Sequence, residues 1–238
     1  GNISSQYISA LMMIAPFTKH GITINIEQKL CSKPYIEMTI RLMGKYGLKV
    51  KNNNFERFVI KPQIKSRQAL PPEEYSIEAD ASSASYIGAF AALHAESSII
   101  LKNMNKKSIQ GDIKFIDYLK KMGCRISQSG TDTKIQGPKR LKSLGEVDMN
   151  KTPDLVMTFA VLAIFCPGRT KIKNIANLRI KETDRIAALK NELKKLNAKV
   201  KTAHDYIEIQ GQKIPNHKIT IKTYDDHRIA MCFGILTT

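Results

Sequence analysis

Hydrophobic residues along this chain recur in a pattern that repeats about every 75 residues. In four places a short polar stretch runs directly into a segment rich in Ala and aliphatic residues. The four polar stretches are Ser4-Ser5-Gln6, Ser82-Ser83-Ala84, Thr152-Pro153-Asp154 and Asp226-His227-Arg228. Ser5, Ser83, Asp154 and Asp226 then hold equivalent positions, at spacings of 78, 71 and 72 residues. A repeat of this length is too long for a simple solenoid unit and fits a small α/β module.

Each repeat reads the same way after its first helix. A strand follows in which apolar and polar residues alternate, as they do over residues 21–26. Two further strands complete the unit, so the pattern is α-β-α-β-β, or βαβαββ when the preceding strand is counted. Between the strands, apolar residues at helical spacing predict second helices over Lys33–Tyr46, Gln110–Met122 and Lys181–Leu196. These helices close on residues that tolerate the left-handed conformation, namely Gly47, Gly123 and Asn197.

The segment Lys61–Tyr75 interrupts the repeat. It contains three prolines, and Pro71-Pro72 can continue neither a helix nor a central strand. We therefore interpret it as a crossover between domains. Residues 1–75 are expected to form the last βαβαββ unit of one domain plus the crossover, and residues 76–238 the units of a second domain, truncated in its final unit.

Composition indicates a chain that lies outside the membrane in a reducing compartment. The 238 residues are 42% hydrophobic and 25% charged, and the longest apolar run, Leu155–Cys166, is far shorter than the ~20 residues that span a bilayer. The first residues show no signal-peptide pattern. The four cysteines are scattered without metal-ligand spacing. We expect reduced thiols, no metal and a cytoplasmic location.

The unusual number is a formal net charge of +17. Such a surface attracts polyanions and also small anionic substrates. Many lysines, such as Lys120-Lys121 and Lys194-Lys195, lie in amphipathic helices where they face water. Aromatic residues make up 7% of the chain and tryptophan is absent, so stacking platforms for single-stranded nucleic acid are sparse. No nucleic-acid-binding motif is present.

The repeat places each polar stretch at the start of a buried helix, where free N–H groups and the helix dipole favour an anion. Ser, Thr and Asp are also ordinary N-cap residues, and capping alone is the simpler interpretation of most of them. Two features exceed capping. Gln6 adjoins Ser4-Ser5, and Asp226-His227-Arg228 stands where one cap residue suffices.

Two more clusters carry candidate chemistry. Lys181 and Arg185 lie four residues apart and share a face if that segment is helical, and Arg185 can bind a phosphate or carboxylate bidentately. The simpler interpretation is a helix start capped by Thr183 or Asp184. In Ser32-Lys33-Pro34-Tyr35, Pro34 is suited to helix entry and Ser32 is a capping hydroxyl. A Ser-Lys pair also occurs in nucleophilic catalysis, but nothing nearby completes such a site.

Taken together, these motifs closely resemble those of EPSP synthase (3-phosphoshikimate 1-carboxyvinyltransferase). The motifs, in the family's order, are Ser4-Ser5-Gln6, Ser32-Lys33-Pro34-Tyr35, the segment Asp80–Tyr86, Gln110-Gly111-Asp112, Pro153-Asp154, the segment Lys181–Arg185 and Asp226-His227-Arg228. The resemblance implies an α/β fold of repeated βαβαββ units, the two-domain enolpyruvyl transferase fold or inside-out α/β barrel, incomplete in this chain. It also implies transfer of the enolpyruvyl group of phosphoenolpyruvate to the 5-hydroxyl of shikimate-3-phosphate, on the route to aromatic amino acids. The family uses no metal and no organic cofactor.

The resemblance further implies roles for individual residues. Asp154 and Glu182 are the expected catalytic residues, as proton acceptor for the hydroxyl and proton donor to the vinyl carbon. The residues expected to hold shikimate-3-phosphate are Ser4, Ser5, Gln6, Ser32, Tyr35, Asp154, Asn177 and Lys181. Those expected at phosphoenolpyruvate, or at the inhibitor glyphosate, are Gln6, Arg185, His227 and Arg228.

The chain departs from the family in length. The family's N-terminal Lys-Ser segment, its Gly-rich loop with an Arg and its C-terminal catalytic Lys have no counterpart here, so we expect a fragment with little turnover of its own and a monomer at full length. Two alternatives stay open. One is UDP-N-acetylglucosamine enolpyruvyl transferase, which shares fold and donor; the other is a non-catalytic basic module that binds anions or nucleic acid.

Overall fold

In a computed structural model, the chain forms two compact units, which are described separately here. The first comprises Gly1–Ile77 with Ile109–Gly111, and the second comprises Glu78–Ser108 with Asp112–Thr238. The structure describes residues 5–27, 30, 32–63, 76–104 and 106–237. Most of the predicted crossover and Ser4 lie outside the described residues, so the assignment of the two units to two domains of a larger enzyme stays a prediction.

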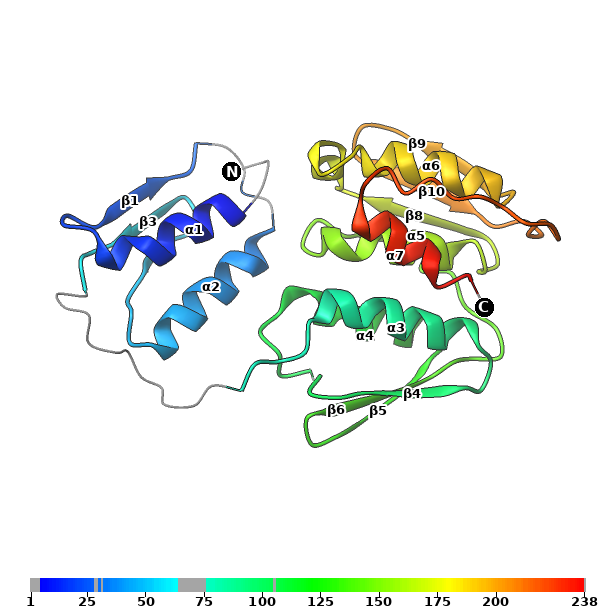
Figure 1. The fold of residues 1–238 in the computed structure, drawn as a ribbon, viewed down its shortest axis with the longest axis horizontal. Helices are drawn as coiled ribbons and strands as arrows, with labels where there is room; N and C mark the ends of the chain where they lie inside the picture. The colour runs from blue at the N-terminus through cyan, green and yellow to red at the C-terminus, as the bar shows by residue number, and fades with distance from the viewer. Residues whose placement is uncertain (1–4, 28–29, 31, 64–75, 105, 238) are drawn as a thin grey trace. The chain divides into compact units, whose positions relative to one another are not determined.

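The first unit packs two helices with one small sheet (Figure 1). Its elements are α1 (Gln6–Ile14), β1 (Ile22–Asn25), α2 (Lys33–Lys45), β2 (Lys51–Asn53) and β3 (Arg57–Ile60). The strand order is β1-β3-β2 and both pairings are antiparallel. Met12, Ile36 and Phe58, one each from α1, α2 and β3, are completely buried in its core. Thr39 Oγ1 donates a hydrogen bond to Ser9 Oγ at 2.9 Å, which joins α2 to α1.

The second unit contains two complete copies of the repeat and the first helix of another. The first copy has α3 (Ala81–Leu93), β4 (Ser98–Leu101), α4 (Phe115–Lys121), β5 (Arg125–Ser129) and β6 (Asp132–Gln136). The second has β7 (Glu146–Asp148), α5 (Val156–Ala163), β8 (Arg169–Lys173), α6 (Arg185–Lys195), β9 (Lys199–Thr202) and β10 (Tyr206–Gln210), and α7 (His227–Gly234) follows. The sheet orders are β4-β6-β5 and β7-β8-β10-β9, with only β7 and β8 parallel.

The Ala- and aliphatic-rich helices lie inside this unit. Every residue of α5 is buried, and α5 contacts both α3 and α7 (Figure 1). A helix that is apolar on all sides belongs in a core rather than at a surface. The amphipathic helices α4 and α6 contact the inner helices as well, and α6 also contacts β9 and β10. The predicted α/β repeat is thus confirmed in three copies.

The C-terminal ends of the helices were predicted correctly, whereas one N-terminal start was not. Gly47, Gly123 and Asn197 have φ of 75°, 105° and 63°, so the predicted left-handed ends are confirmed. The prediction of a helix over Gln110–Met122 is wrong at its start, because a 3₁₀ turn, Gly111–Lys114, precedes α4.

Several predicted caps are wrong. Asp80, not Ser82 or Ser83, caps α3, because its carboxylate accepts from the backbone N–H groups of both serines. Ser5 and Ser32 occupy N-cap positions without a side-chain cap bond. Ser32 has a left-handed backbone with φ of 54°, which is not the extended geometry a capping hydroxyl needs.

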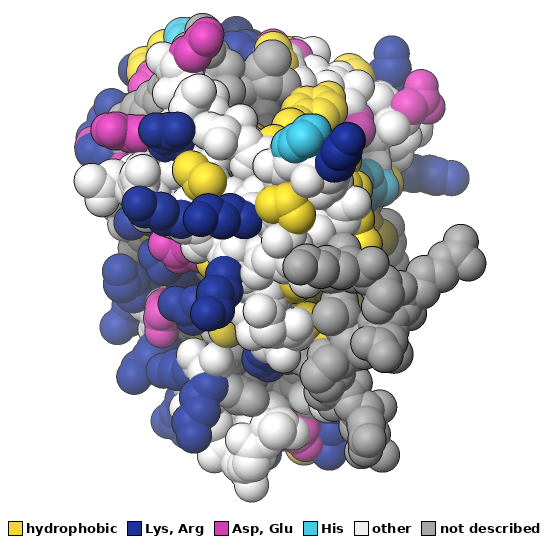
Figure 2. Space-filling view, turned by 90° about the vertical axis from the view of Figure 1, so that its left-hand side faces the viewer, with side chains coloured by type: hydrophobic (Ala, Val, Ile, Leu, Met, Phe, Trp, Pro, Cys, Tyr) yellow, Lys and Arg dark blue, Asp and Glu magenta, His cyan; other side chains and the backbone are white. Residues whose placement is uncertain are grey.

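Basic side chains are dispersed over the surface. On the face drawn in Figure 2, Lys and Arg lie among Asp, Glu and uncharged side chains. Seven of the ion pairs among the described residues of the second unit, such as Lys102–Asp132 and Lys173–Glu146, include a side chain more than 40% exposed to water. No helix in the described ranges is long and apolar enough to cross a bilayer.

Candidate active site

An arginine-carboxylate cluster gathers where α6 and α7 begin. Arg185 is the first residue of α6, and Asp226 is the N-cap of α7. Arg185 Nε donates to Asp226 Oδ2 at 2.8 Å, and Arg185 Nη2 lies 3.3 Å from Asp226 Oδ1. The same carboxylate accepts from the backbone N–H of Arg228 at 2.8 Å. Asp226 therefore has two roles: it caps the N-terminus of α7, and it fixes the plane of the Arg185 guanidinium.

A second carboxylate links two arginines. Asp154 lies in the 3₁₀ turn Pro153–Leu155 that leads into α5. Its Oδ2 accepts from Arg228 Nη2 at 2.7 Å, and its Oδ1 lies 3.4 Å from Arg185 Nη1. Arg185 Nη2 also donates to Glu182 Oε2 at 2.6 Å. Two guanidinium groups thus face one small region, held by carboxylates from three separate segments.

Burial decides which of these groups can meet a ligand. The side chains of Arg185 and Asp226 are 1% and 0% exposed, whereas those of Asp154 and Arg228 are 18% and 17% exposed and that of Glu182 is 48% exposed. The Arg185–Asp226 pair is therefore the fixed part of the cluster. Asp154, Arg228 and Glu182 form the part that a solute reaches first, and the carboxylates of Asp154 and Glu182 cover the Nη groups of Arg185.

The ionisable groups of the cluster respond to burial in different ways. Burial by itself raises the pKa of Asp226, but the bonds from Arg185 and from the Arg228 backbone outweigh it and hold that pKa below its ordinary value. Tyr86, on α3, approaches Arg228 with its hydroxyl 3.4 Å from Nη1. Burial raises the pKa of Tyr86 although Arg228 opposes the rise. Tyr86 is therefore a neutral hydroxyl beside a cation at neutral pH.

The loop before α6 corrects one sequence prediction. Lys181 has an extended backbone, with φ −88° and ψ −154°, so Lys181 and Arg185 do not share a helical face. The helix begins at Arg185 because Asp184 is its cap and accepts from the Ala187 N–H at 3.0 Å. The capped-start interpretation with Asp184 is confirmed. Arg179 Nη1 donates to Asp184 Oδ2 at 2.7 Å and secures this loop from the other side.

Asn177 stands out among the buried polar residues. It lies in the 3₁₀ turn Ala176–Ile180 and is 8% exposed. Neither its amide nitrogen nor its amide oxygen has a hydrogen-bond partner within the described residues. A buried amide left unpaired is costly, so such a group is expected to serve a ligand or a water molecule.

The first unit holds the other predicted binding residues. Ser5 is buried and Gln6 is exposed at the start of α1. Ser32 is buried and Tyr35 is half-buried at the start of α2. Both pairs begin helices that pack against each other within this unit. Ser4 lies outside the described residues.

Sequence reasoning missed Asp226 and Tyr86 as site residues, although both stood in the motifs. The repeat made Asp226 equivalent to Asp154, and that equivalence was the available signal. His227, which was predicted to line the site, has an exposed side chain at the first position of α7. Within the described residues, no group of three or more His, Cys, Asp and Glu side chains is arranged to hold a metal ion.

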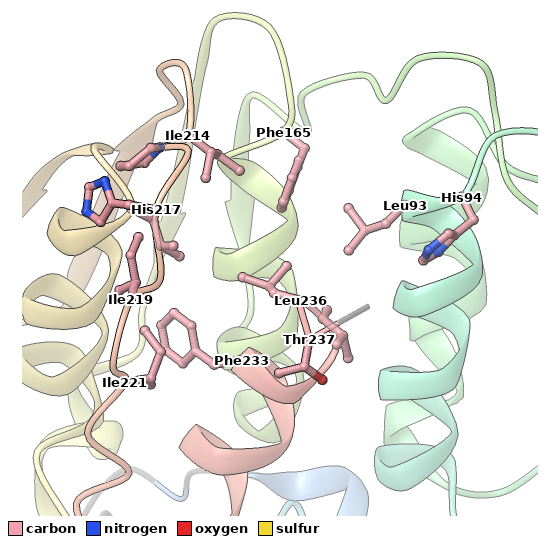
Figure 3. Close-up of a pocket in the computed structure, with 13 residues that line it drawn as sticks. Leu93, His94, Phe165, Ile214, His217, Ile219, Ile221, Phe233, Leu236 and Thr237 are labelled. Atoms are coloured by element: carbon pink, nitrogen blue, oxygen red, sulfur yellow. The ribbon is translucent and has the colours of Figure 1, made fainter.

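A separate cavity of about 410 Å³ lies at the other end of α7 (Figure 3). Ile214, Ile219, Ile221, Phe233 and Leu236 contribute to its lining. His94 and His217 are its only ionisable side chains, and no Lys or Arg lines it. This cavity therefore suits an apolar group, in contrast to the charged lining of the arginine-carboxylate cluster.

Solved structures define the class of fold. The chain matches EPSP synthase from Acinetobacter baumannii with a TM-score of 0.72 and 22% identity, covering 98% of this chain and 53% of that one. It also matches the enolpyruvyl transferase NikO from Streptomyces tendae with a TM-score of 0.63 and 15% identity, over 94% and 50% of the two chains. The fold is thus part of the enolpyruvyl transferase fold, as the sequence predicted.

The sequence comparisons are more specific. The family model for EPSP synthase (3-phosphoshikimate 1-carboxyvinyltransferase) matches residues 1–238, and the chain belongs to this family. It is 45% identical over 237 residues to the 3-phosphoshikimate 1-carboxyvinyltransferase of Shewanella woodyi and 46% identical over 237 residues to that of Buchnera aphidicola. Each match covers 99% of this chain and 54% of the relative, so the chain spans about half the length of these curated relatives.

Proposed function

We propose that this chain is part of an enzyme that transfers the enolpyruvyl group of phosphoenolpyruvate to the 5-hydroxyl of shikimate-3-phosphate, releasing phosphate. Membership of the family, with 45% identity to a relative of that name, supports this activity. The observation that carries it is the joining of Arg185 and Arg228 by Asp154. Two guanidinium groups that bond the same carboxylate can each bind two oxygens of an anion. They therefore suit a substrate that carries both a phosphate and a carboxylate.

In this proposal the arginines hold phosphoenolpyruvate. Its anionic oxygens take over guanidinium N–H groups that now bond Asp154 and Glu182. The exchange frees the Asp154 carboxylate to accept the proton of the attacking hydroxyl. Glu182, the most exposed acid of the cluster, donates a proton to the methylene carbon while the attacking oxygen bonds to the neighbouring carbon. In the second step Glu182 takes a proton back from the new methyl group, the bond between carbon and phosphate oxygen breaks, and the phosphate leaves with the proton that Asp154 had accepted. Binding of phosphoenolpyruvate to the arginines is then the same step that frees Asp154 to act as the base.

Shikimate-3-phosphate is assigned to the remaining predicted residues. Asn177 offers a donor and an acceptor that no described residue uses, and both suit the hydroxyl and phosphate oxygens of a sugar-like acid. Lys181 follows on the same loop, as the residue directly after the 3₁₀ turn. Ser5, Gln6, Ser32 and Tyr35 are the contribution proposed for the first unit. We further propose a cytoplasmic, monomeric full-length enzyme that needs neither metal nor cofactor and binds no nucleic acid.

A chimera provides the test. This chain replaces the matching 237 residues of the Shewanella woodyi relative, and phosphate release is followed with both substrates. We expect release that depends on shikimate-3-phosphate and phosphoenolpyruvate together. Arg228→Lys should lower kcat/KM strongly, because the ammonium group of lysine lacks the planar fork that binds two oxygens of one phosphate or carboxylate side by side. The exposed Arg125→Lys on β5 is the matched control.

Two outcomes decide against the proposal. A folded chimera that binds shikimate-3-phosphate without releasing phosphate contradicts the assigned chemistry. Turnover with UDP-N-acetylglucosamine in place of shikimate-3-phosphate supports the related transferase instead.

A further inference from the structure

Helix α6 holds the segment Lys222–Asp226 at two points. Arg185 bonds Asp226 at one end of the segment. At the other end, Glu192 Oε2 accepts from the Lys222 N–H at 3.0 Å and Glu192 Oε1 accepts from the Tyr224 hydroxyl at 2.8 Å. Arg185 and Glu192 are seven residues apart, which is about two helical turns, so they lie on one face of α6. The segment therefore runs along α6, in the opposite direction, toward the arginine-carboxylate cluster.

The segment ends in a strained turn. Tyr224 and Asp225 have φ of 58° and 53°, and the Asp226 N–H donates to Thr223 O at 3.1 Å. Positive φ at both central residues is the feature of a type I′ turn, where Gly, Asn and Asp are usual. A tyrosine there is disfavoured because its Cβ approaches the backbone. Such a conformation persists only when the surroundings hold it in place.

Glu192 is built to hold it. Its side chain is 1% exposed, and it also accepts from Lys195 Nζ at 2.6 Å. Lys195 in turn donates to Thr220 O at 3.1 Å, two residues before that segment begins. Burial works against ionisation of Glu192, but its three donors outweigh burial and keep its pKa below the ordinary value. A fixed negative charge thus anchors the turn through one backbone N–H and one hydroxyl.

We propose that Glu192 is a positioning residue for the arginine-carboxylate cluster, although it does not touch the arginines itself. By fixing the Thr223–Asp226 turn, it places the Asp226 carboxylate against Arg185 and starts α7 at the orientation that points Arg228 toward Asp154. The four Cα-to-Cα steps from Lys222 to Asp226 can span more than the two helical turns between the anchors when the chain is extended. The Thr223–Asp226 turn shortens the segment to fit between the anchors. Without the Glu192 anchor the turn can open, and the Asp226 carboxylate can then move away from Arg185. The further statement that this cluster binds an anionic ligand rests on the proposed function.

The test uses two substitutions that change little in shape. Tyr224→Phe removes only the hydroxyl, and Glu192→Gln removes the charge while keeping an oxygen acceptor. The control is Glu146→Gln, which breaks the Glu146–Lys173 ion pair elsewhere in the same unit. Hydrogen exchange is measured by NMR at the Arg228 amide and at Arg185 Nε–H, and at Ile172 and Ile207 in the sheet as an internal reference.

We expect both variants to speed exchange at the Arg185 and Arg228 sites by about tenfold, the effect of about 1.4 kcal/mol. Exchange at Ile172 and Ile207 should stay unchanged, and the control should change none of the four. Equal acceleration at all four sites would show that Glu192 contributes only general stability. Unchanged exchange at Arg185 and Arg228 overturns the proposal too.

Titration with phosphoenolpyruvate separates this proposal from the proposed function. If the wild-type chain binds it, both variants should weaken binding by about tenfold, again about 1.4 kcal/mol. If the wild-type chain and the chimera both fail to bind it, the proposed function fails. The exchange rates still decide the role of Glu192 in that case.

Discussion

Arg185 at the start of α6 donates to Asp226 at the start of α7 across 2.8 Å, and both side chains are withdrawn from water. Removal of Asp226 leaves the buried Arg185 with only the more exposed carboxylates of Asp154 and Glu182 among its bonded partners described above, and loss of a buried partner costs about 3–5 kcal/mol. We therefore expect Asp226→Ala to lower the free energy of unfolding by about that amount. Urea denaturation followed by circular dichroism measures it. The double variant Arg185→Met with Asp226→Leu should lose less than the two single variants together; additive losses would count against the pair.

The same pair makes stability depend on pH. The pKa of Asp226 is lowered in the folded chain, so its contribution is present above the unfolded value of about 3.9 and disappears as pH falls through the lower folded value. The difference in unfolding free energy between wild type and Asp226→Asn should thus be largest at pH 6 and shrink toward pH 3. Acids that lie away from the arginine-carboxylate cluster are unaffected by the substitution, so their contributions cancel in this difference. A difference that stays constant with pH contradicts this assignment.

The cap of α3 can be tested with two neighbouring substitutions. Asp80 accepts from two backbone N–H groups, at 2.8 Å from Ser82 and 3.4 Å from Ser83. Its replacement by alanine should cost about 1 kcal/mol of unfolding free energy. Ser83→Ala is the matched control, because the Ser83 hydroxyl only donates to Asp80 and should cost less. Equal losses in the two variants would mean that the carboxylate is not the cap.

Replacement of Asn177 by an apolar residue should raise the stability of the fold and remove a ligand contact. Its amide is buried and unpaired within the described residues, so Asn177→Leu should raise the free energy of unfolding by about 1–3 kcal/mol. The same change should abolish binding of shikimate-3-phosphate in the chimera. Thermal unfolding and calorimetric titration measure the two effects. A less stable variant with intact binding would show that Asn177 serves neither purpose.

The thiols of the second unit should be slow to react. Burial raises the pKa of Cys124 to about 11 and that of Cys166 to about 12, and it raises the pKa of Cys232 as well. At pH 8 few thiolates form in the folded chain. In a Cys31→Ser background, Ellman's reagent should therefore modify these three thiols only when urea is added. Rapid modification in buffer would contradict their burial.

The sequence predicted the repeat but not the contacts between its copies. Helical and strand periods are local, so β1, α2 and α6 lie within a few residues of the ranges that the sequence predicted. The identity of the caps was not predictable, because Asp80 and Ser83 are both good cap residues and only the backbone decides between them. Lys181 is extended because Asp184 stops the helix in front of it. The contact of Tyr86 with Arg228 joins residues 142 positions apart, and no local pattern contains it.

The inner helices α3 and α7 and the turn before α5 each begin with an acid, at Asp80, Asp154 and Asp226. The three carboxylates do different work: Asp80 caps α3, Asp154 links two arginine side chains, and Asp226 caps α7 while it also bonds the Arg185 side chain. Asp154 and Asp226 hold equivalent positions in the repeat, and Asp80 lies three residues before Ser83, their counterpart. An acid near this point can therefore bond the helix start, an arginine side chain or both. Residues at these positions can be swapped between the repeats of this one chain. Such swaps show directly whether helix capping or arginine binding constrains each position.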